Sequence, residues 1–353
     1  MKITTPYDEI PRSSTEGFFI YRVKCCFALL IMVLSLSACS VSQRGGLDNL
    51  RDEDKSDSEI TPKNHSHPFI IFISDTQSPM KIETLWLKYT DNDKATARLF
   101  AEIVSEKGAD AVFHLGDIVA VGSSSKEWET AGKHLLKLKE AGLPFYPIPG
   151  NHEYMFFPDE GMEYFHKGFP ELSRTWYTVR DGPLAIVLLN SNFSQITNEE
   201  LSNQRLWYEE QLRKLDNDPS VRAVIVATHH PPYTNSKIVQ ASSEVQKEFV
   251  PLFSKYRKSR LFISGHAHAF EHFREQGKDF LVIGGGGGLL HPLRTGSEQK
   301  RRGIFSEKTD KRFFHYITCS LEETGLEVSV KMLRPDQSGF EVPYRLIIPL
   351  KDN

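Results

Sequence analysis

Cysteine is scarce in this chain, and its distribution excludes a disulfide-stabilised fold. Only four of the 353 residues are cysteine. Cys25, Cys26 and Cys39 lie near the amino terminus, which leaves Cys319 alone in the body of the chain, inside the apolar segment 316–319. A disulfide framework needs paired cysteines along the domain. A hydrophobic core must therefore stabilise this fold, and we expect Cys319 to be a small core residue.

The chain also has no large excess of charge of either sign. It carries 43 Lys and Arg against 46 Asp and Glu, which is a net charge of -3. We therefore expect no nucleic-acid partner and no general polyanion partner. Hydrophobic residues make up 39% and charged residues 25% of the chain, a globular composition at a length that allows one large domain or two small ones.

The apolar run 25–36 is too short to span a bilayer as a helix. Basic residues precede it and small residues follow it, as in a secretory signal. Segment 36–39, Leu-Ser-Ala-Cys, resembles a bacterial lipobox, in which cleavage precedes an acylated cysteine. We predict a lipoprotein-type signal peptide over 1–38 and an exported protein anchored to the bacterial cell envelope by a lipid on Cys39, facing the periplasm or the cell surface. Plain secretion is the alternative.

Residues 39–67 are rich in Ser, Asp, Lys, Asn and Gly, and contain almost no large apolar side chains. This composition predicts a disordered spacer between the anchor and a domain over 68–350. His65 and His67 lie in the spacer, and we interpret them as solvated linker residues in preference to a two-histidine metal site.

Strand and helix patterns alternate along the domain. The run 69–73 is typical of a strand buried on both faces, and runs at 111–115 and 145–148 repeat it. Helical patterns over about 91–108 and 126–140 separate these runs, which predicts parallel βαβ pairing. The second half predicts further strands at 184–189, 223–227, 261–263, 280–283, 314–319, 326–332 and 345–350, with helices at 199–215 and 244–256.

Five of the predicted strands end in side chains that bind metals or phosphate. Such strand ends are where open α/β sheets place their sites. Carboxylate, imidazole and amide groups together suit divalent ions such as Mn, Fe or Zn, and not a structural thiolate zinc site. The strand-end residues are Asp75 with Gln77, Asp117, Asn151 with His152, His229 with His230, and His266 with His268.

The order of these motifs resembles the calcineurin-like metallophosphoesterase superfamily, and within it the purple-acid-phosphatase-like branch. The motifs are Asp75, Gly116-Asp117, Gly150-Asn151-His152-Glu153, His229-His230-Pro231-Pro232 and Gly265-His266-Ala267-His268, within residues 69–350. The resemblance implies an α/β fold in which a two-sheet β-sandwich is flanked by helices, the αββα metallophosphoesterase fold. It also implies a cofactor of two divalent or mixed-valence metal ions, Mn, Fe or Zn.

The resemblance further implies roles for individual residues. Asp117 would bridge the two ions and act in catalysis, and His152 would face the leaving group as a hydrogen-bond donor or general acid. Asp75 and His268 would hold the first ion. The second would be held by Asn151, His229 and His266.

Two positions depart from the family patterns. Gln77 stands where the family usually has histidine, and Ala120 stands where the purple branch has tyrosine. The Gln77 amide oxygen can still bind a metal, and as a harder ligand than imidazole it favours Mn or Fe(II) over zinc. A vacant first site is the alternative. Without a tyrosinate ligand we expect no purple colour.

We predict a phosphoester hydrolase that acts on a phosphorylated small molecule through attack by a metal-bridging hydroxide. Monoesters are the first choice, with diesterase or pyrophosphohydrolase activity as the alternative. Asn151 and His230 are the expected substrate contacts, although His230 is equally compatible with a wall of the site. A degenerate, non-catalytic surface binding module is the alternative from a different class.

Several residues near these motifs permit two interpretations each. Glu153 either orients the histidine before it or lies on the surface. The glycines of 284–288 allow close backbone approach to the metals, which we favour over a flexible crossing. His272 and His291 are interpreted as surface residues rather than as the mouth of the site. The basic stretch 291–313 is either a solvated insertion or a rim that selects anionic substrates.

Overall fold

The computed structural model describes residues 65–85, 87, 90–305 and 312–350. The predicted signal peptide lies outside the described residues, as does the predicted spacer up to residue 64. In the part of the chain that the structure describes, no helix is both long enough and apolar enough to cross a membrane.

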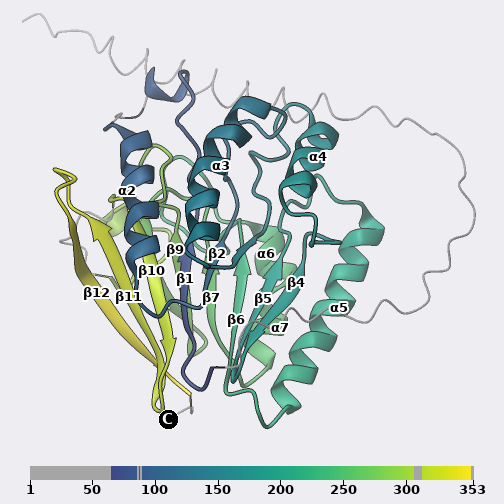
Figure 1. Ribbon diagram of the computed structural model, residues 1–353. Coiled ribbons are helices and arrows are strands. Elements are labelled where there is room, and N and C mark those ends of the chain that lie inside the picture. Colours follow the sequence, from purple (N-terminus) through teal and green to yellow (C-terminus); the bar gives the residue numbers. More distant parts are fainter. Residues whose placement is uncertain (1–64, 86, 88–89, 306–311, 351–353) are drawn as a thin grey trace, which may run out of the picture. The chain divides into compact units, whose positions relative to one another are not determined.

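Two six-stranded sheets form the domain (Figure 1). The strand order is β12-β11-β10-β1-β2-β3 in the first sheet and β4-β5-β6-β7-β9-β8 in the second. This confirms the predicted two-sheet α/β fold. The strands are β1 (Phe69–Ile73), β2 (Ala111–His114), β3 (Phe145–Pro147), β4 (Tyr177–Asp181), β5 (Leu184–Leu189), β6 (Ala223–Thr228), β7 (Ser259–Ser264), β8 (Phe270–Glu275), β9 (Lys278–Ile283), β10 (His315–Leu321), β11 (Gly325–Leu333) and β12 (Phe340–Pro349).

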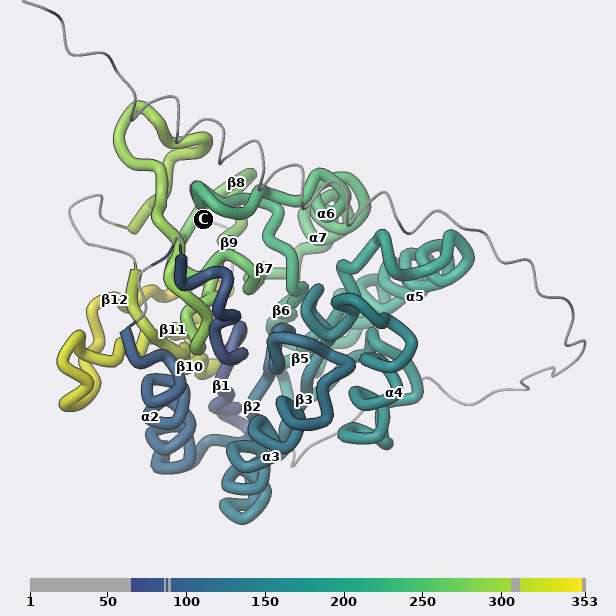
Figure 2. The backbone as a smooth tube through the Cα atoms, turned by 90° about the horizontal axis from the view of Figure 1, so that it is seen from above, coloured from purple at the N-terminus to yellow at the C-terminus, as the bar shows by residue number. Residues whose placement is uncertain are grey.

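Helices cover the outer face of each sheet, α2 and α3 on one side of the sandwich and α5 to α7 on the other (Figure 2). Leu99 of α2 and Leu138 of α3 pack in one cluster with Ile71 and Ile73 of β1. The helices are α2 (Asn92–Ser105), α3 (Ser125–Glu140), α4 (Pro158–Gly168), α5 (Asn198–Asn217), α6 (Ser243–Glu248) and α7 (Val250–Lys255), with short 3₁₀ turns η1 (Glu83–Leu85) and η2 (Gly296–Glu298).

The largest hydrophobic cluster lies between the two sheets. Ile70 and Phe72 of β1 meet Ile225 of β6 and Ile263 of β7 there. The alternate β1 residues face the helices, so the strand is buried on both sides and has no polar positions. Each fully buried side chain of this size contributes about 2 kcal/mol to stability. Cys319 belongs to the same cluster as a free, fully buried thiol, which confirms its predicted core role.

Parallel pairing brings the predicted strand ends together. β1, β2 and β3 pair parallel in the first sheet, and β5, β6 and β7 pair parallel in the second. The strands of each set therefore end at one edge of their sheet.

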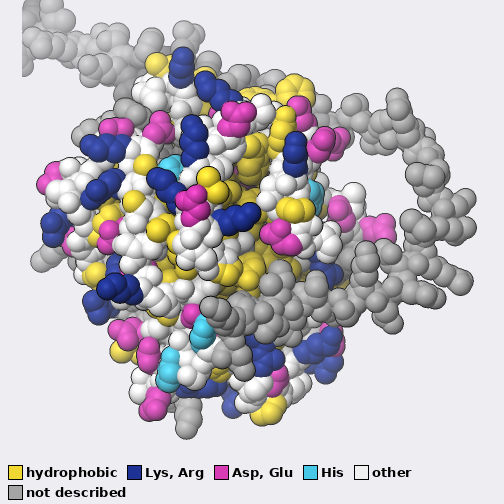
Figure 3. Space-filling view, viewed as in Figure 1, with side chains coloured by type: hydrophobic (Ala, Val, Ile, Leu, Met, Phe, Trp, Pro, Cys, Tyr) yellow, Lys and Arg dark blue, Asp and Glu magenta, His cyan; other side chains and the backbone are white. Residues whose placement is uncertain are grey.

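On the described part of the face seen in Figure 3, Lys and Arg side chains lie interspersed with Asp and Glu.

Some sequence predictions of secondary structure are wrong in detail. The helix expected over 244–256 is two short helices, α6 and α7, because Pro251 has no N–H group to continue a single helix across the junction. Strand β3 is a half-buried edge strand and not a fully buried one. Helix α4 and strands β4 and β8 were not predicted. In β8, buried Glu271 and His272 interrupt the expected apolar pattern.

Candidate metal centre

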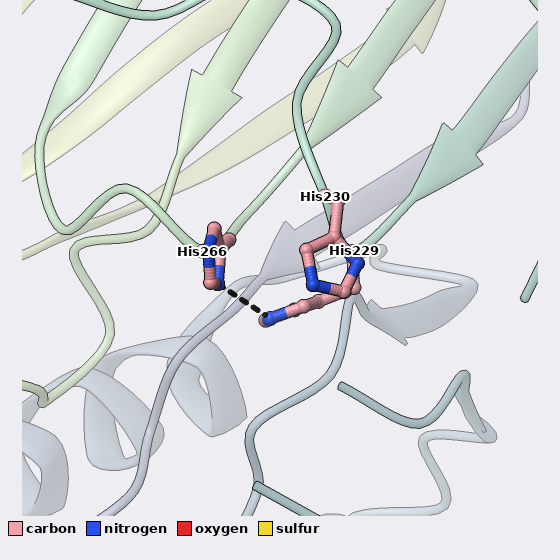
Figure 4. A group of neighbouring side chains, drawn as sticks. All are labelled: His229, His230 and His266. Atoms are coloured by element: carbon pink, nitrogen blue, oxygen red, sulfur yellow. Dashed lines mark hydrogen bonds between the residues drawn. The ribbon is translucent and has the colours of Figure 1, made fainter. Parts of the chain in front are cut away.

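The structure brings all five predicted strand ends into one polar cluster. Asp75 follows β1, Asp117 follows β2, and Asn151 with His152 follows β3. In the second sheet, His229 with His230 follows β6, and His266 with His268 follows β7. Three of these four histidines, His229, His230 and His266, converge in Figure 4.

His229 is at the centre of one group of candidate ligands. Its Nε2 lies 3.0 Å from Asn151 Oδ1, 3.2 Å from His266 Nδ1 and 3.3 Å from Asp117 Oδ2. The four atoms come from four different strand ends, and local sequence does not require them to meet. This is the set predicted to hold the second ion.

A second group lies around Asp75. The Asp75, Asp117 and His268 ligand atoms lie within 4.8 Å of one another, and His268 Nε2 is 3.4 Å from Asp75 Oδ1. The Gln77 amide nitrogen is 3.4 Å from the same His268 nitrogen, while the buried Gln77 Oε1 has no hydrogen-bond partner among the residues that the structure describes. A buried carbonyl oxygen without a partner costs free energy, so a cation beside it would satisfy the amide.

The histidines are held with one ring nitrogen free for the site. Nδ1 of His229, His268 and His152 lies 2.8, 2.9 and 2.7 Å from backbone carbonyl oxygens, those of Leu115, Leu289 and Ala120. A carbonyl accepts a hydrogen bond, so each Nδ1 carries a proton and Nε2 is the ring nitrogen that faces the cluster. Together with the unsatisfied Gln77 oxygen, this donor set fits two divalent ions.

Charges in the cluster act strongly on one another. Burial opposes ionisation of Asp117, but the charges of His229 and His152 outweigh it and hold the Asp117 pKa well below its ordinary value. Burial would lower the pKa of His229, yet Asp117 raises it to about 9. Burial and the neighbouring His229 lower the pKa of His230 to about 3, and burial with His230 holds the pKa of His266 well below its usual range.

Left-handed backbone aims three of the side chains. Asp75, Asp117 and His266 have φ of 60°, 57° and 65°. Few residues other than glycine adopt this conformation, and it concentrates at functional sites where the surroundings enforce it. Asp75 is locked by the His266 backbone N–H, which lies 3.0 and 2.9 Å from its two carboxylate oxygens.

The glycine segment 284–288 passes directly behind the cluster. The Gly286 and Gly288 N–H groups donate to the Ser74 and Asp75 carbonyl oxygens at 2.9 and 3.0 Å. A Cβ at Gly288 would lie 2.2 Å from the His268 ring. Only glycine fits between these groups.

Glu153 has a different role from either of the predicted ones. It is fully buried, and no hydrogen bond joins it to His152 among the described contacts. Its Oε1 accepts the N–H groups of Ile118 and Val119 at 2.7 and 3.2 Å, and its Oε2 accepts those of Asp117 and Gly150 at 2.9 and 2.6 Å. Burial and the Asp117 charge raise the Glu153 pKa to about 7, against these donors. Glu153 therefore ties two ligand-bearing loops together.

Sequence reasoning missed a sixth strand end, residues 190–192 after β5. Asn192 Nδ2 donates to the Pro149 carbonyl at 2.9 Å, next to the Gly-Asn-His segment. Ser191 Oγ lies 2.9 Å from the His230 backbone nitrogen and 3.0 Å from His230 Nδ1. The same strand-end criterion would have found these residues, since β5 ends in Asn-Ser-Asn.

Three other histidines differ from their predictions. His272 is buried, between Asp279 and Tyr344, and His291 is buried and stacked on His268 with 4.2 Å between ring centroids, so neither is a surface residue. His65 is not fully solvated. Its Nδ1 lies 3.0 Å from Asp110 and 3.2 Å from Asp181, at the amino end of β2 and away from the metal centre.

The basic stretch is partly used for structure. Arg301 lies over the Tyr233 ring, 4.0 Å from its centroid, and pairs with Glu275. Arg294 bonds the Ser236 carbonyl. Residues 306–311 lie outside the described residues, so both interpretations of this segment stay open.

Two adjoining groups of candidate metal ligands at the carboxyl ends of two mixed sheets, flanked by helices, are typical of the metallophosphoesterase class of fold. The chain belongs to the calcineurin-like phosphoesterase family, whose model matches residues 70–270. The comparisons therefore place it in a family of metal-dependent phosphoester hydrolases.

One relative by sequence and two solved structures of similar fold resemble this chain. The chain is 29% identical over 207 residues to a probable glycerophosphodiester phosphodiesterase, GpdQ, of Arcobacter nitrofigilis, covering 56% of this chain and 71% of the relative. Its fold is similar to that of a dimetal phosphatase from Danio rerio, with a TM-score of 0.52, 14% identity and coverage of 80% and 99%. It is also similar to GAP50, the anchor in the inner membrane complex of Plasmodium, with a TM-score of 0.57, 15% identity and coverage of 81% and 90%.

Proposed function

We propose that this chain is a dinuclear-metal phosphoester hydrolase. We further propose that it prefers phosphodiesters as substrates to phosphomonoesters, which were the first choice from the sequence. The observation that carries the proposal is the position of Asp117. Its carboxylate belongs to the group with Asp75 and His268 and also lies 3.3 Å from His229 Nε2. One carboxylate shared by two donor groups is what a pair of ions requires.

The donors divide between two ions. Asp75, Gln77 and His268 would hold the first, and Asn151, His229 and His266 the second, with Asp117 common to both. Bound divalent ions would supply Lewis-acid polarisation of the phosphoryl group and a nucleophile at neutral pH. The amide of Gln77 favours Mn or Fe(II) over Zn.

His152 is placed to serve the leaving group. Its backbone N–H donates to Asp117 Oδ1 at 2.9 Å, and its Nδ1 bonds the Ala120 carbonyl. The Nε2 edge lies 3.9 Å from Asp117 Oδ2, so it remains beside the cluster without being a member of either donor group. In this position it would donate a hydrogen bond or a proton to the departing oxygen.

The surroundings favour the single negative charge of a diester over the double charge of a monoester. Among the described residues, the charged groups that act most strongly on Asp117, His229, His230 and His266 are carboxylates and imidazoles rather than arginine or lysine. A guanidinium fork is the usual protein partner of a phosphate dianion. The name of the Arcobacter relative points in the same direction.

Turnover and metal content, measured on the same sample, test this function. We expect the Mn-loaded full chain to hydrolyse bis(p-nitrophenyl) phosphate with a higher kcat/KM than p-nitrophenyl phosphate. Asn151→Ala should lose metal affinity by about 10- to 100-fold, and turnover with it, because it removes one donor. Glu163→Gln, on the exposed side of α4, should change neither.

The two parts of the proposal fail in different ways. A higher kcat/KM for the monoester would overturn the diester preference and leave the hydrolase. Bound metal without turnover of either ester would favour the non-catalytic binding module instead.

We also propose that the protein is exported and anchored through a lipid on Cys39, because the Leu-Ser-Ala-Cys segment follows a signal-like apolar run. Expressed in a Gram-negative host with an alkyne palmitate analogue, the wild-type chain should be labelled and should fractionate with membranes. Cys39→Ala should be unlabelled. Label retained in Cys39→Ala, or absent from the wild type, would contradict the anchor.

A further inference from the structure

Residues 190–192, which we call the brace, follow β5 in the second sheet and contact the loop that follows β3 in the first sheet. Asn192 Nδ2 donates to the Pro149 carbonyl at 2.9 Å. Asn190 Nδ2 donates to the Tyr154 hydroxyl at 2.9 Å. These two hydrogen bonds lie just before and just after the Gly-Asn-His-Glu segment of that loop. The brace therefore holds both ends of a segment that carries a predicted metal ligand.

Backbone groups fix the orientation of both asparagine amides. The Pro149 carbonyl can only accept, so the Asn192 atom beside it is the amide nitrogen. The Asn192 backbone N–H can only donate, so the atom that it meets at 2.9 Å is the Asn190 amide oxygen. Asn192 Nδ2 also donates to that oxygen at 2.9 Å, and Asn190 Nδ2 donates to Thr175 Oγ1 at 2.8 Å. Each amide nitrogen thus has two acceptors, and neither side chain can turn over without losing them.

Helix α5 holds the backbone of the brace. Gln204 of α5 is fully buried, and its Oε1 accepts the Asn190 N–H at 2.7 Å while its Nε2 donates to the Asn190 carbonyl at 3.0 Å. The brace also contacts the loop that follows β6, because Ser191 Oγ accepts the His230 backbone N–H at 2.9 Å. One segment therefore joins a helix to two loops that carry predicted ligands, and the two loops belong to different sheets.

We propose that the brace is a positioning element that holds Asn151 against His229 and so sets the affinity of the second metal ion. Asn151 Oδ1 lies 3.0 Å from His229 Nε2, although the two residues come from different sheets. Donors that are already held together bind an ion without the cost of ordering their loops. Among the described hydrogen bonds, none joins the brace to the donors of the first ion, Asp75, Gln77 and His268. The effect is therefore confined to the second ion. This inference rests on the proposed dinuclear hydrolase.

Titration of the metal-free full chain with Mn²⁺ tests the brace without any measurement of turnover. Gln77→Ala and Asn151→Ala assign the two binding steps, because each removes a donor of one ion only. Asn192→Leu keeps a side chain of similar size but has no N–H donor. It should lower the affinity of the second ion by about tenfold and leave that of the first unchanged. Tyr154→Phe removes only the hydroxyl that Asn190 reaches, and should weaken the second ion by about threefold, the lower range for one neutral hydrogen bond.

Three controls separate positioning from a general loss of stability. Asn203→Leu makes the same substitution at an exposed position of α5 and should change neither affinity. Leu212→Ala shortens a buried side chain of α5 in the cluster against the second sheet, so it should lower stability and still bind both ions normally. In an Asn151→Ala background, Asn192→Leu should have little further effect on the second ion, because the brace acts through Asn151.

Each outcome decides the proposal. Wild-type affinity for the second ion in Asn192→Leu and Tyr154→Phe would overturn it. An equal loss of both ions, or a matching loss in Leu212→Ala, would show that the brace only stabilises the fold. Failure of the proposed function looks different, because a wild type that binds two ions but hydrolyses no ester rejects the hydrolase while the titration still decides the brace. A wild type that binds a single ion would reject both.

Discussion

Gly288→Ala is expected to weaken the first metal ion's binding by about 100-fold, the upper end of what disturbing a ligand's support costs. A Cβ at this position would lie 2.2 Å from Cε1 and 2.5 Å from Nδ1 of His268. The backbone cannot retreat, because the Gly288 N–H is bonded to the Asp75 carbonyl and the Gly288 carbonyl accepts from Asn92 Nδ2 at 3.0 Å. The His268 ring must therefore leave both the Leu289 carbonyl and Asp75.

The experiment compares metal content and stability in matched variants. Gly132→Ala is the control, because a Cβ there meets nothing within 4 Å and the residue lies inside helix α3. It should keep both ions and gain about 0.5–1 kcal/mol of stability. Gly288→Ala should lose about 1–3 kcal/mol through overpacking. Metal titration followed by mass-spectrometric counting gives the occupancy, and wild-type affinity at both sites would show that the ring position is not constrained as described.

Glu153→Gln is expected to lower the free energy of unfolding of the metal-free protein by about 1–3 kcal/mol, the cost of leaving buried N–H donors without an acceptor. Each Glu153 oxygen accepts two backbone N–H groups, from Ile118 and Val119 on one side and from Asp117 and Gly150 on the other. The side-chain amide of glutamine replaces one oxygen. Whichever way it turns, two buried N–H donors then face an NH₂ group and lose their acceptor.

Urea unfolding measures this loss, with Glu163→Gln as the control. Glu163 is exposed on α4, and its neutralisation should change stability by less than about 0.5 kcal/mol. Metal affinity should fall in Glu153→Gln as well, because the loops that carry Asp117 and Asn151 lose their common anchor. A Glu153→Gln protein as stable as the control would show that these four bonds contribute little.

Much of the metal centre was predictable because strand ends obey a simple rule. A continuous apolar run marks a strand buried on both faces, and parallel pairing places successive carboxyl ends at one edge. Asp75, Asp117, Asn151, His229 and His266 all satisfied this rule and all converge. Residues 190–192 satisfy the same rule. Their side chains hydrogen-bond to other residues of the site and belong to neither donor group.

Other features could not be predicted from local pattern. The acceptor role of Glu153 depends on two loops that meet only in the folded chain. Nothing in the local sequence indicates that the glutamate after Gly-Asn-His is buried. Strand β8 has Glu271 and His272 inside the protein, where Thr234, Asn235, Asp279 and Tyr344 satisfy them. Polar partners from distant segments make such a strand stable, so its sequence lacks the usual apolar run.

The sequence by itself determined the α/β class, the parallel pairing of the βαβ strands and the chemistry of the donor set, because apolar periodicity and residue type act locally. Tertiary structure alone decided how those donors are aimed. Three features do this: the left-handed backbone at Asp75, Asp117 and His266, the glycine segment against His268, and the Ser191–His230 pair. None of them would be stable in an isolated segment of the chain. They persist because contacts from both sheets hold them, and such contacts exist only once the chain has folded.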